Sequence, residues 1–113
     1  MQTRLITVAE TQMFRRQAEK IWREEELAEL VIHLATNPAV GDVIPGTGGV
    51  RKLRWGREGS GKRGGARVIY FYHNADQPVY LLLAYAKAQA SDLTPDEKRT
   101  LTALAATLKG DKS

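Results

Sequence analysis

Four basic residues in the second half of the chain have the types and spacing that phosphodiester chemistry requires. Lys52 and Arg54 alternate along one predicted strand. Arg67 begins the next strand, and Lys87 ends the one after it. On an antiparallel sheet these positions can converge on one patch, and Tyr85 points the same way as Lys87. Such a patch can hold a phosphodiester and stabilise the extra charge of a pentacoordinate transition state.

RNA is the substrate class that requires the fewest catalytic groups from the protein, because its own 2′-OH is the nucleophile. The protein must deprotonate this hydroxyl, hold it in line and protonate the leaving 5′ oxygen. A lysine among other cations, or a tyrosine, can move these protons. The alternative is an exposed cationic face that binds RNA or a partner without chemistry, and basic patches bind far more often than they cut.

The positive charge of the chain is concentrated in one stretch. Residues 49–67 contain seven bases and one acid, a net charge of +6, whereas the whole chain of 113 residues carries +4. A local basic face of this kind is typical of nucleic-acid binding. We therefore expect a second group of side chains in this stretch to contact RNA: Arg51, Trp55, Arg57, Lys62 and Arg63.

Nucleotide and metal sites are disfavoured. The segment Gly56-x4-Gly61-Lys62-Arg63 nearly matches a phosphate-binding P-loop, but arginine replaces the Ser/Thr that would hold Mg²⁺. The chain has no cysteine, neither of its two histidines has a partner at ligand spacing, and no carboxylates cluster as in a two-metal nuclease. We expect no cofactor, no metal and a metal-independent reaction.

Four strands and three helices are expected to position these residues. The strands cover residues 4–8, 50–55, 67–73 and 79–87, with a turn at residues 74–78. The helices cover residues 11–24 and 25–36 and a segment that starts at Thr94-Pro95-Asp96-Glu97, which has the composition of a capping box. Residues 37–47 are read as a loop, rich in glycine towards its end.

The expected fold is one α+β domain over residues 1–113. It has an antiparallel sheet of three or four strands, with two N-terminal helices and one C-terminal helix packed on one face. The other face carries the basic residues and is open to a ligand. The longest apolar run, residues 79–86, is too short to span a bilayer. The N-terminus lacks a signal-peptide pattern, so we expect a cytoplasmic protein without membrane contact.

These motifs together resemble the HigB branch of the RelE/ParE toxin superfamily. The resemblance rests on GDVIPGTGGVRKLRW, GSGKRGGARVIYFY and YLLLAYAKAQASDL, which follow in order from about Asn37 to Leu93. It implies the toxin of a type II toxin–antitoxin pair, a ribosome-dependent mRNA endonuclease (mRNA interferase) that inhibits translation through 2′-OH attack. The implied partners are a HigA-like helix-turn-helix antitoxin, the 70S ribosome and mRNA, with no direct DNA binding.

The resemblance also assigns roles to residues. Phosphate binding and transition-state stabilisation carry over to the four cations Lys52, Arg54, Arg67 and Lys87. Ala88 stands where RelE proteins have a further arginine, and no tyrosine follows in the C-terminal helix to act as base. Proton transfer is therefore assigned to Tyr85, Lys52 or Lys87, in no fixed order. The loop cations Arg57, Lys62 and Arg63 are expected to dock on the ribosome.

Two alternatives stay open. One is a ParE-like inhibitor of DNA gyrase on the same fold, which the retained Lys52, Arg54 and Arg67 disfavour. The other is a non-catalytic module that binds RNA or a partner, suggested by the alanine at position 88.

Overall fold

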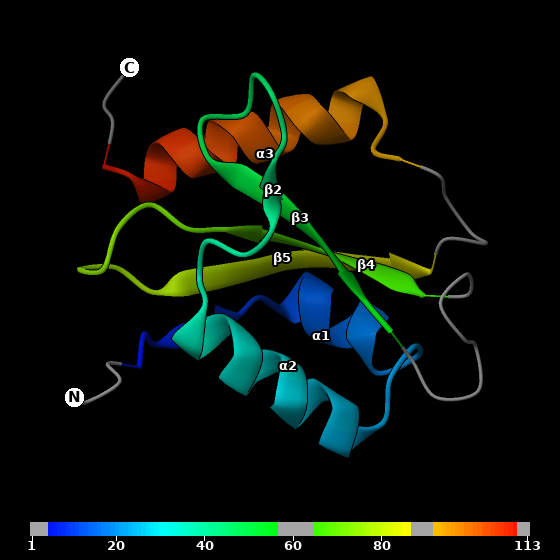
Figure 1. Ribbon diagram of the computed structural model, residues 1–113. Helices are drawn as coiled ribbons and strands as arrows, with labels where there is room; N and C mark the ends of the chain where they lie inside the picture. Colours follow the sequence, from blue (N-terminus) through cyan, green and yellow to red (C-terminus); the bar gives the residue numbers. More distant parts are fainter. Residues whose placement is uncertain (1–4, 57–64, 87–91, 111–113) are drawn as a thin grey trace.

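The computed structural model describes residues 5–56, 65–86 and 92–110. The elements follow in the order β1 (Val8–Glu10), α1 (Gln12–Ala18), α2 (Glu24–Thr36), β2 (Asp42–Val43), β3 (Val50–Trp55), β4 (Ala66–Phe71), β5 (Val79–Ala86) and α3 (Pro95–Leu108). These strands form one sheet in the order β1-β5-β4-β3-β2. Helices α1 and α2 lie on one face of the sheet and α3 lies on the other (Figure 1). No helix in the described ranges is long and apolar enough to cross a membrane.

The α+β class is confirmed, but the predicted sheet was wrong in two respects. The sheet is mixed, because β1 runs parallel to β5 at its edge. It also has five strands in the described residues, because Asp42 and Val43 pair antiparallel with Lys52 and Arg51 on β3. This fifth strand, β2, has only two residues and therefore shows no alternation that a sequence pattern could reveal.

The expectation that all helices pack on one face was also wrong. Two separate hydrophobic clusters lie on the two faces of the sheet. One contains Phe14 of α1 and Leu30 of α2, and the other contains Leu101 of α3. Strand β4 contributes to both clusters, since Val68 packs in the first and Ile69 in the second. A strand buried on both faces reads as a continuous apolar run, which is the pattern of residues 68–71.

Helix α1 is shorter than predicted, whereas α3 starts where the sequence predicts. α1 ends at Ala18 and not at residue 24, and the chain then turns so that Trp22 enters the core, where its indole Nε1 donates to the Gly56 carbonyl at 2.9 Å. The start of α3 agrees with the prediction. The Thr94 side chain accepts from the Glu97 amide, and the Glu97 carboxylate accepts from the Thr94 amide.

A bulge in β5 decides which of its side chains face α3. Ile69 pairs with Leu83, whereas the next residue on β4 pairs with Leu81, so Leu82 is an extra residue without a partner on β4. Leu81 consequently faces α1 and α2, while Leu83 and Tyr85 pack on the α3 side. The extra residue therefore places Tyr85 on the same face as the basic residues of β3 and β4.

The loop between β2 and β3 fixes the start of β3. Thr47 is buried, and its hydroxyl donates to the Ile44 carbonyl at 2.6 Å and accepts from the Val50 amide at 3.2 Å. The loop also needs glycine, because Gly46 and Gly48 have φ values of 78° and 77° that side chains disfavour.

Candidate functional site

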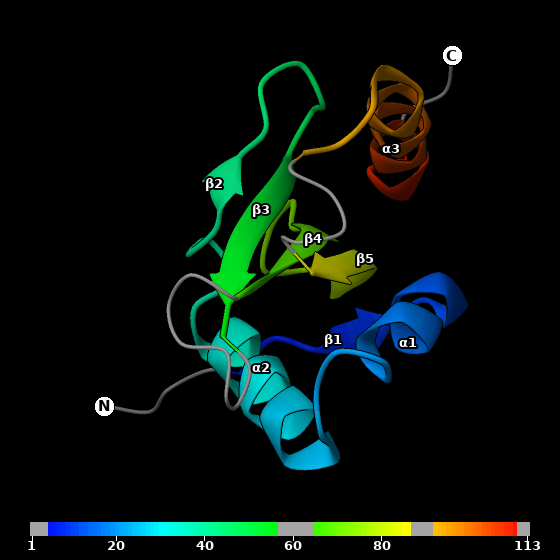
Figure 2. The ribbon, with the colours of Figure 1, turned by 90° about the vertical axis from the view of Figure 1, so that its right-hand side faces the viewer.

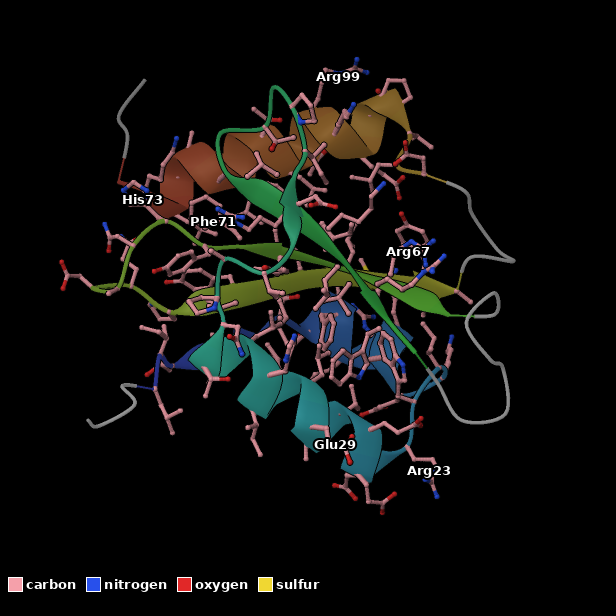
Figure 3. All side chains as sticks on the ribbon, viewed as in Figure 1. Arg23, Glu29, Arg67, Phe71, His73 and Arg99 are labelled. Carbon is pink, nitrogen blue, oxygen red and sulfur yellow. The ribbon has the colours of Figure 1, made fainter. Side chains whose placement is uncertain are left out.

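The basic residues meet in a row across three strands at one end of the sheet. Arg54 on β3 pairs directly with Arg67 on β4, and Arg67 pairs directly with Tyr85 on β5. Directly paired residues share a face, and neighbouring strands lie about 4.8 Å apart. The three backbones therefore span about 10 Å, which is within the reach of long side chains. Figure 3 shows Arg67 at this end, far from Phe71 and His73 at the other.

Within this row Tyr85 packs against the cluster under α3, whereas Arg54 and Arg67 do not. The buried core of that cluster includes Val50, Ile69, Phe71 and Leu82, whereas Arg54 is exposed and Arg67 is half-buried. Within the described residues neither guanidinium has an acidic partner; Arg67 makes only a long contact to the carbonyl of Ala66, at 3.5 Å. Two facing cations without an acid form a site that an anion can neutralise.

Lys52 lies on the same face and has an acidic partner that the sequence analysis missed. Its ammonium is 3.6 Å from the carboxylate of Asp92, just before α3. The backbone amide of Leu93, and then the charge of Lys52, lower the pKa of Asp92. Asp92 belongs to the last of the motifs that carry the family resemblance, but Lys52 lies far away in the sequence, so no local spacing could reveal the pair.

Tyr85 carries the most unusual polar atom of the site. Its hydroxyl oxygen is buried and has no hydrogen-bond partner among the residues that the structure describes. Burial raises the pKa of this phenol, the nearby charge of Asp92 raises it further, and Arg67 partly opposes both. The phenol is therefore protonated at neutral pH, so that it can donate a proton or a hydrogen bond but is a poor base.

Arg51 and Trp55 lie on the opposite face of β3, as the alternation predicts. The Arg51 guanidinium donates to the carbonyls of Ala39 and Gly41 at 3.0 and 2.7 Å. The Trp55 indole donates to the Glu26 carbonyl at 3.3 Å and its side chain packs against the core. Both side chains thus have structural partners, and the geometry does not bring them to the row of Arg54, Arg67 and Tyr85.

Four of the predicted site residues lie outside the described ranges. They are Lys87, Arg57, Lys62 and Arg63. The near-match to a P-loop falls largely on the same undescribed segment. In the described part of the chain no three histidine, aspartate or glutamate side chains come close enough together to hold a metal ion.

The described site can thus bind and polarise a phosphodiester. Arg54 and Arg67 supply positive charge in a fixed register, Lys52 supplies a third cation, and Tyr85 supplies a protonated hydroxyl. Charge fixed in place before the reaction is what stabilises a phosphorane-like transition state.

A comparison with known protein families supports the superfamily resemblance that the sequence shows. A family model described as the RelE toxin of the RelE / RelB toxin-antitoxin system matches residues 6–113, nearly the whole chain. The match includes the sheet, all three helices and the row of basic residues. The superfamily resemblance seen in the sequence is therefore confirmed, and the chain belongs to the RelE toxin family.

Proposed function

We propose that this chain is a HigB-type toxin that cleaves mRNA on the ribosome in the cytoplasm and is silenced by a HigA-like antitoxin. The observation that supports the proposal is the in-register row of Arg54, Arg67 and Tyr85. A gyrase inhibitor would need a protein-binding surface, and nothing in its action requires two facing cations beside a protonated phenol.

The reaction assigns a role to each described side chain. Arg54 and Arg67 hold the scissile phosphate and stabilise its transition-state charge, and Lys52 acts beside them. The 2′ oxygen forms a bond to phosphorus while the bond from phosphorus to the 5′ oxygen breaks. Tyr85 donates the proton that the leaving 5′ oxygen takes up. Lys87, as a neutral amine, accepts the proton of the 2′-OH, because Lys52 already acts as a cation beside the two arginines.

The products provide a chemical test of this route. Attack by the 2′-OH leaves a 2′,3′-cyclic phosphate on one fragment and a free 5′-hydroxyl on the other. The 5′ ends of the cut mRNA should therefore accept label from polynucleotide kinase without prior phosphatase treatment. Fragments that carry a 5′-phosphate would contradict the proposed chemistry.

The decisive variant is Arg67→Ala. We expect it to lower mRNA cleavage about 10²–10³-fold, the range for loss of one charge-stabilising donor, and to relieve growth inhibition. Arg99→Ala is the matched control, because Arg99 is exposed on α3 and, among the described residues, pairs only with Asp96. Circular dichroism must show that both variants fold, and primer extension on mRNA from expressing cells measures cleavage. A folded Arg67→Ala protein with full toxicity would contradict the role of Arg67 in cleavage. A wild-type protein that is toxic but leaves mRNA uncut would favour gyrase inhibition.

A further inference from the structure

A second feature lies beside the row, on the outer edge of β5. The parallel strand β1 pairs only with Val79, Tyr80 and Leu81, so on this outer edge the second half of β5 has no neighbouring strand among the described residues. Helix α1 lies along this edge instead (Figure 2). The side-chain oxygen of Gln17 accepts from the Ala84 amide at 2.9 Å, and so satisfies a backbone donor that a strand would otherwise pair.

Between α1 and this edge lies a groove of about 400 Å³, which we call the α1–β5 groove. Its apolar lining comes from Met13, Ile21, Ala84 and Tyr85. The volume falls within the range of about 300–1,000 Å³ that is typical of small-molecule sites. Tyr85 belongs both to this groove and to the row with Arg54 and Arg67, so the two features adjoin.

The polar side of the groove is cationic. Arg16 and Lys20 line it, and both side chains are exposed. Neither makes an ion pair within the described residues. The adjacent Arg15, in contrast, is 3.2 Å from the carboxylate of Glu10 and 3.8 Å from that of Glu19. The acids near α1 thus neutralise the cation outside the groove and leave the two cations that line it available for an anion.

A groove with apolar walls and two cations that have no acidic partner in the described residues suits a nucleotide. The phosphate can bind the cations, and the base can lie against the apolar side chains of Met13 and Ile21. We infer that the α1–β5 groove binds the nucleotide next to the scissile phosphodiester of the same RNA strand, with its phosphate on Arg16 and Lys20. This inference rests on the proposed function, because the neighbouring row defines where the strand is cut.

Salt-dependent RNA binding tests the inference without the ribosome. The ligand is a short single-stranded RNA with 2′-O-methyl groups throughout, which the toxin cannot cut, and the measurement is fluorescence anisotropy from about 50 to 200 mM salt. In the Arg16→Gln/Lys20→Gln variant we expect weaker binding and a slope of log K against log salt that is smaller by about 0.7 for one lost phosphate contact. Arg15→Gln removes one positive charge from the same helix outside the groove and should leave the slope unchanged.

Three results would overturn the inference. One is an equal slope for the double variant and the wild type, and another is a wild-type protein that does not bind the RNA. The third is a double variant that binds RNA normally but associates less with ribosomes, which would assign the two cations to ribosomal RNA.

The groove and the proposed function can fail separately. Wild-type protein that binds the RNA through Arg16 and Lys20 but cuts no mRNA would contradict only the proposed function. Wild-type protein that cuts mRNA while the double variant binds RNA normally would contradict only the groove.

Discussion

Replacing Tyr85 with phenylalanine removes one oxygen, and we predict that it raises stability while it lowers activity. The hydroxyl is buried without a hydrogen-bond partner in the described residues. An unsatisfied buried polar group destabilises the folded state by about 1–3 kcal/mol. The Tyr85 side chain is only half-buried overall, so we take the lower end of that range. The expected gain is about 1 kcal/mol in the free energy of unfolding, or a rise of roughly 4 °C in Tm.

The activity should change in the opposite direction. If Tyr85 donates the proton to the leaving 5′ oxygen, its loss should lower mRNA cleavage by about 10²–10⁴-fold, the usual contribution of a positioned general acid. A purely structural tyrosine would show no such loss, because the phenylalanine ring retains its packing. Urea denaturation measures the first effect and primer extension the second.

Tyr70→Phe is the matched control on the neighbouring strand. The Tyr70 hydroxyl accepts from the Gly41 amide at 2.8 Å and donates to the Pro38 carbonyl at 2.9 Å. Its removal leaves both groups unpaired, so we expect a loss of about 2 kcal/mol in stability, with normal cleavage by the folded fraction. The reasoning is refuted if Tyr85→Phe lowers stability by more than about 1 kcal/mol, or if it folds and cleaves mRNA like the wild type.

Three further predictions concern charge. Asp92→Asn removes a charge that raises the pKa of Tyr85, so the alkaline limb of the pH–rate profile should move to lower pH; an unmoved limb would contradict the acid role of Tyr85. Burial raises the pKa of both Tyr70 and Tyr85 above 10.0. Above that pH the unfolded chain loses these protons before the folded protein does, so the free energy of unfolding should fall with rising pH. The fall should be smaller in the Tyr70→Phe and Tyr85→Phe variants. Pyrophosphate should raise Tm through the facing Arg54 and Arg67, and the rise should shrink in Arg67→Gln; an equal rise in both proteins, at matched ionic strength, would count against an anion site.

Local signals in the sequence predicted those parts of the fold that depend on neighbouring residues. The alternation of residues 50–55 placed Lys52 and Arg54 on one face, and the Thr94 capping box fixed the start of α3. What failed depended on contacts between distant segments. Neither the parallel pairing of β1 with β5 nor the position of α3 on the second face follows from a periodicity. The apolar run of β4 did indicate that the sheet is covered on both faces, because a strand that is buried on both faces needs a packing layer on each side.

In the candidate site, too, the sequence predicts some features and not others. The types of Arg54 and Arg67 and their strands were predictable, but their direct pairing was not. The segment between the strands leaves the register open, and a shift of one residue would move one of the arginines to the other face. Likewise, the orientation of Tyr85 depends on the extra residue Leu82, and no feature of the sequence marks that bulge.

The distribution of unfavourable features is an argument for function that does not depend on family membership. Arg54 and Arg67 are like charges that face each other across two strands, an arrangement that destabilises a sheet. The unsatisfied hydroxyl of Tyr85 adjoins them. Arg16 and Lys20 lie nearby on α1, at the outer edge of β5, without acids of their own in the described residues.

Packing does not require any of these features, since alanine or glutamine at the charged positions and phenylalanine at position 85 would remove each penalty. On the neighbouring strand the buried hydroxyl of Tyr70, in contrast, has both a donor and an acceptor. Sites that bind a ligand commonly retain local features that lower the stability of the free protein. Because three such features coincide at one end of the sheet, a single ligand that brings negative charge and a hydrogen-bond acceptor can relieve them together, and an RNA phosphodiester brings both.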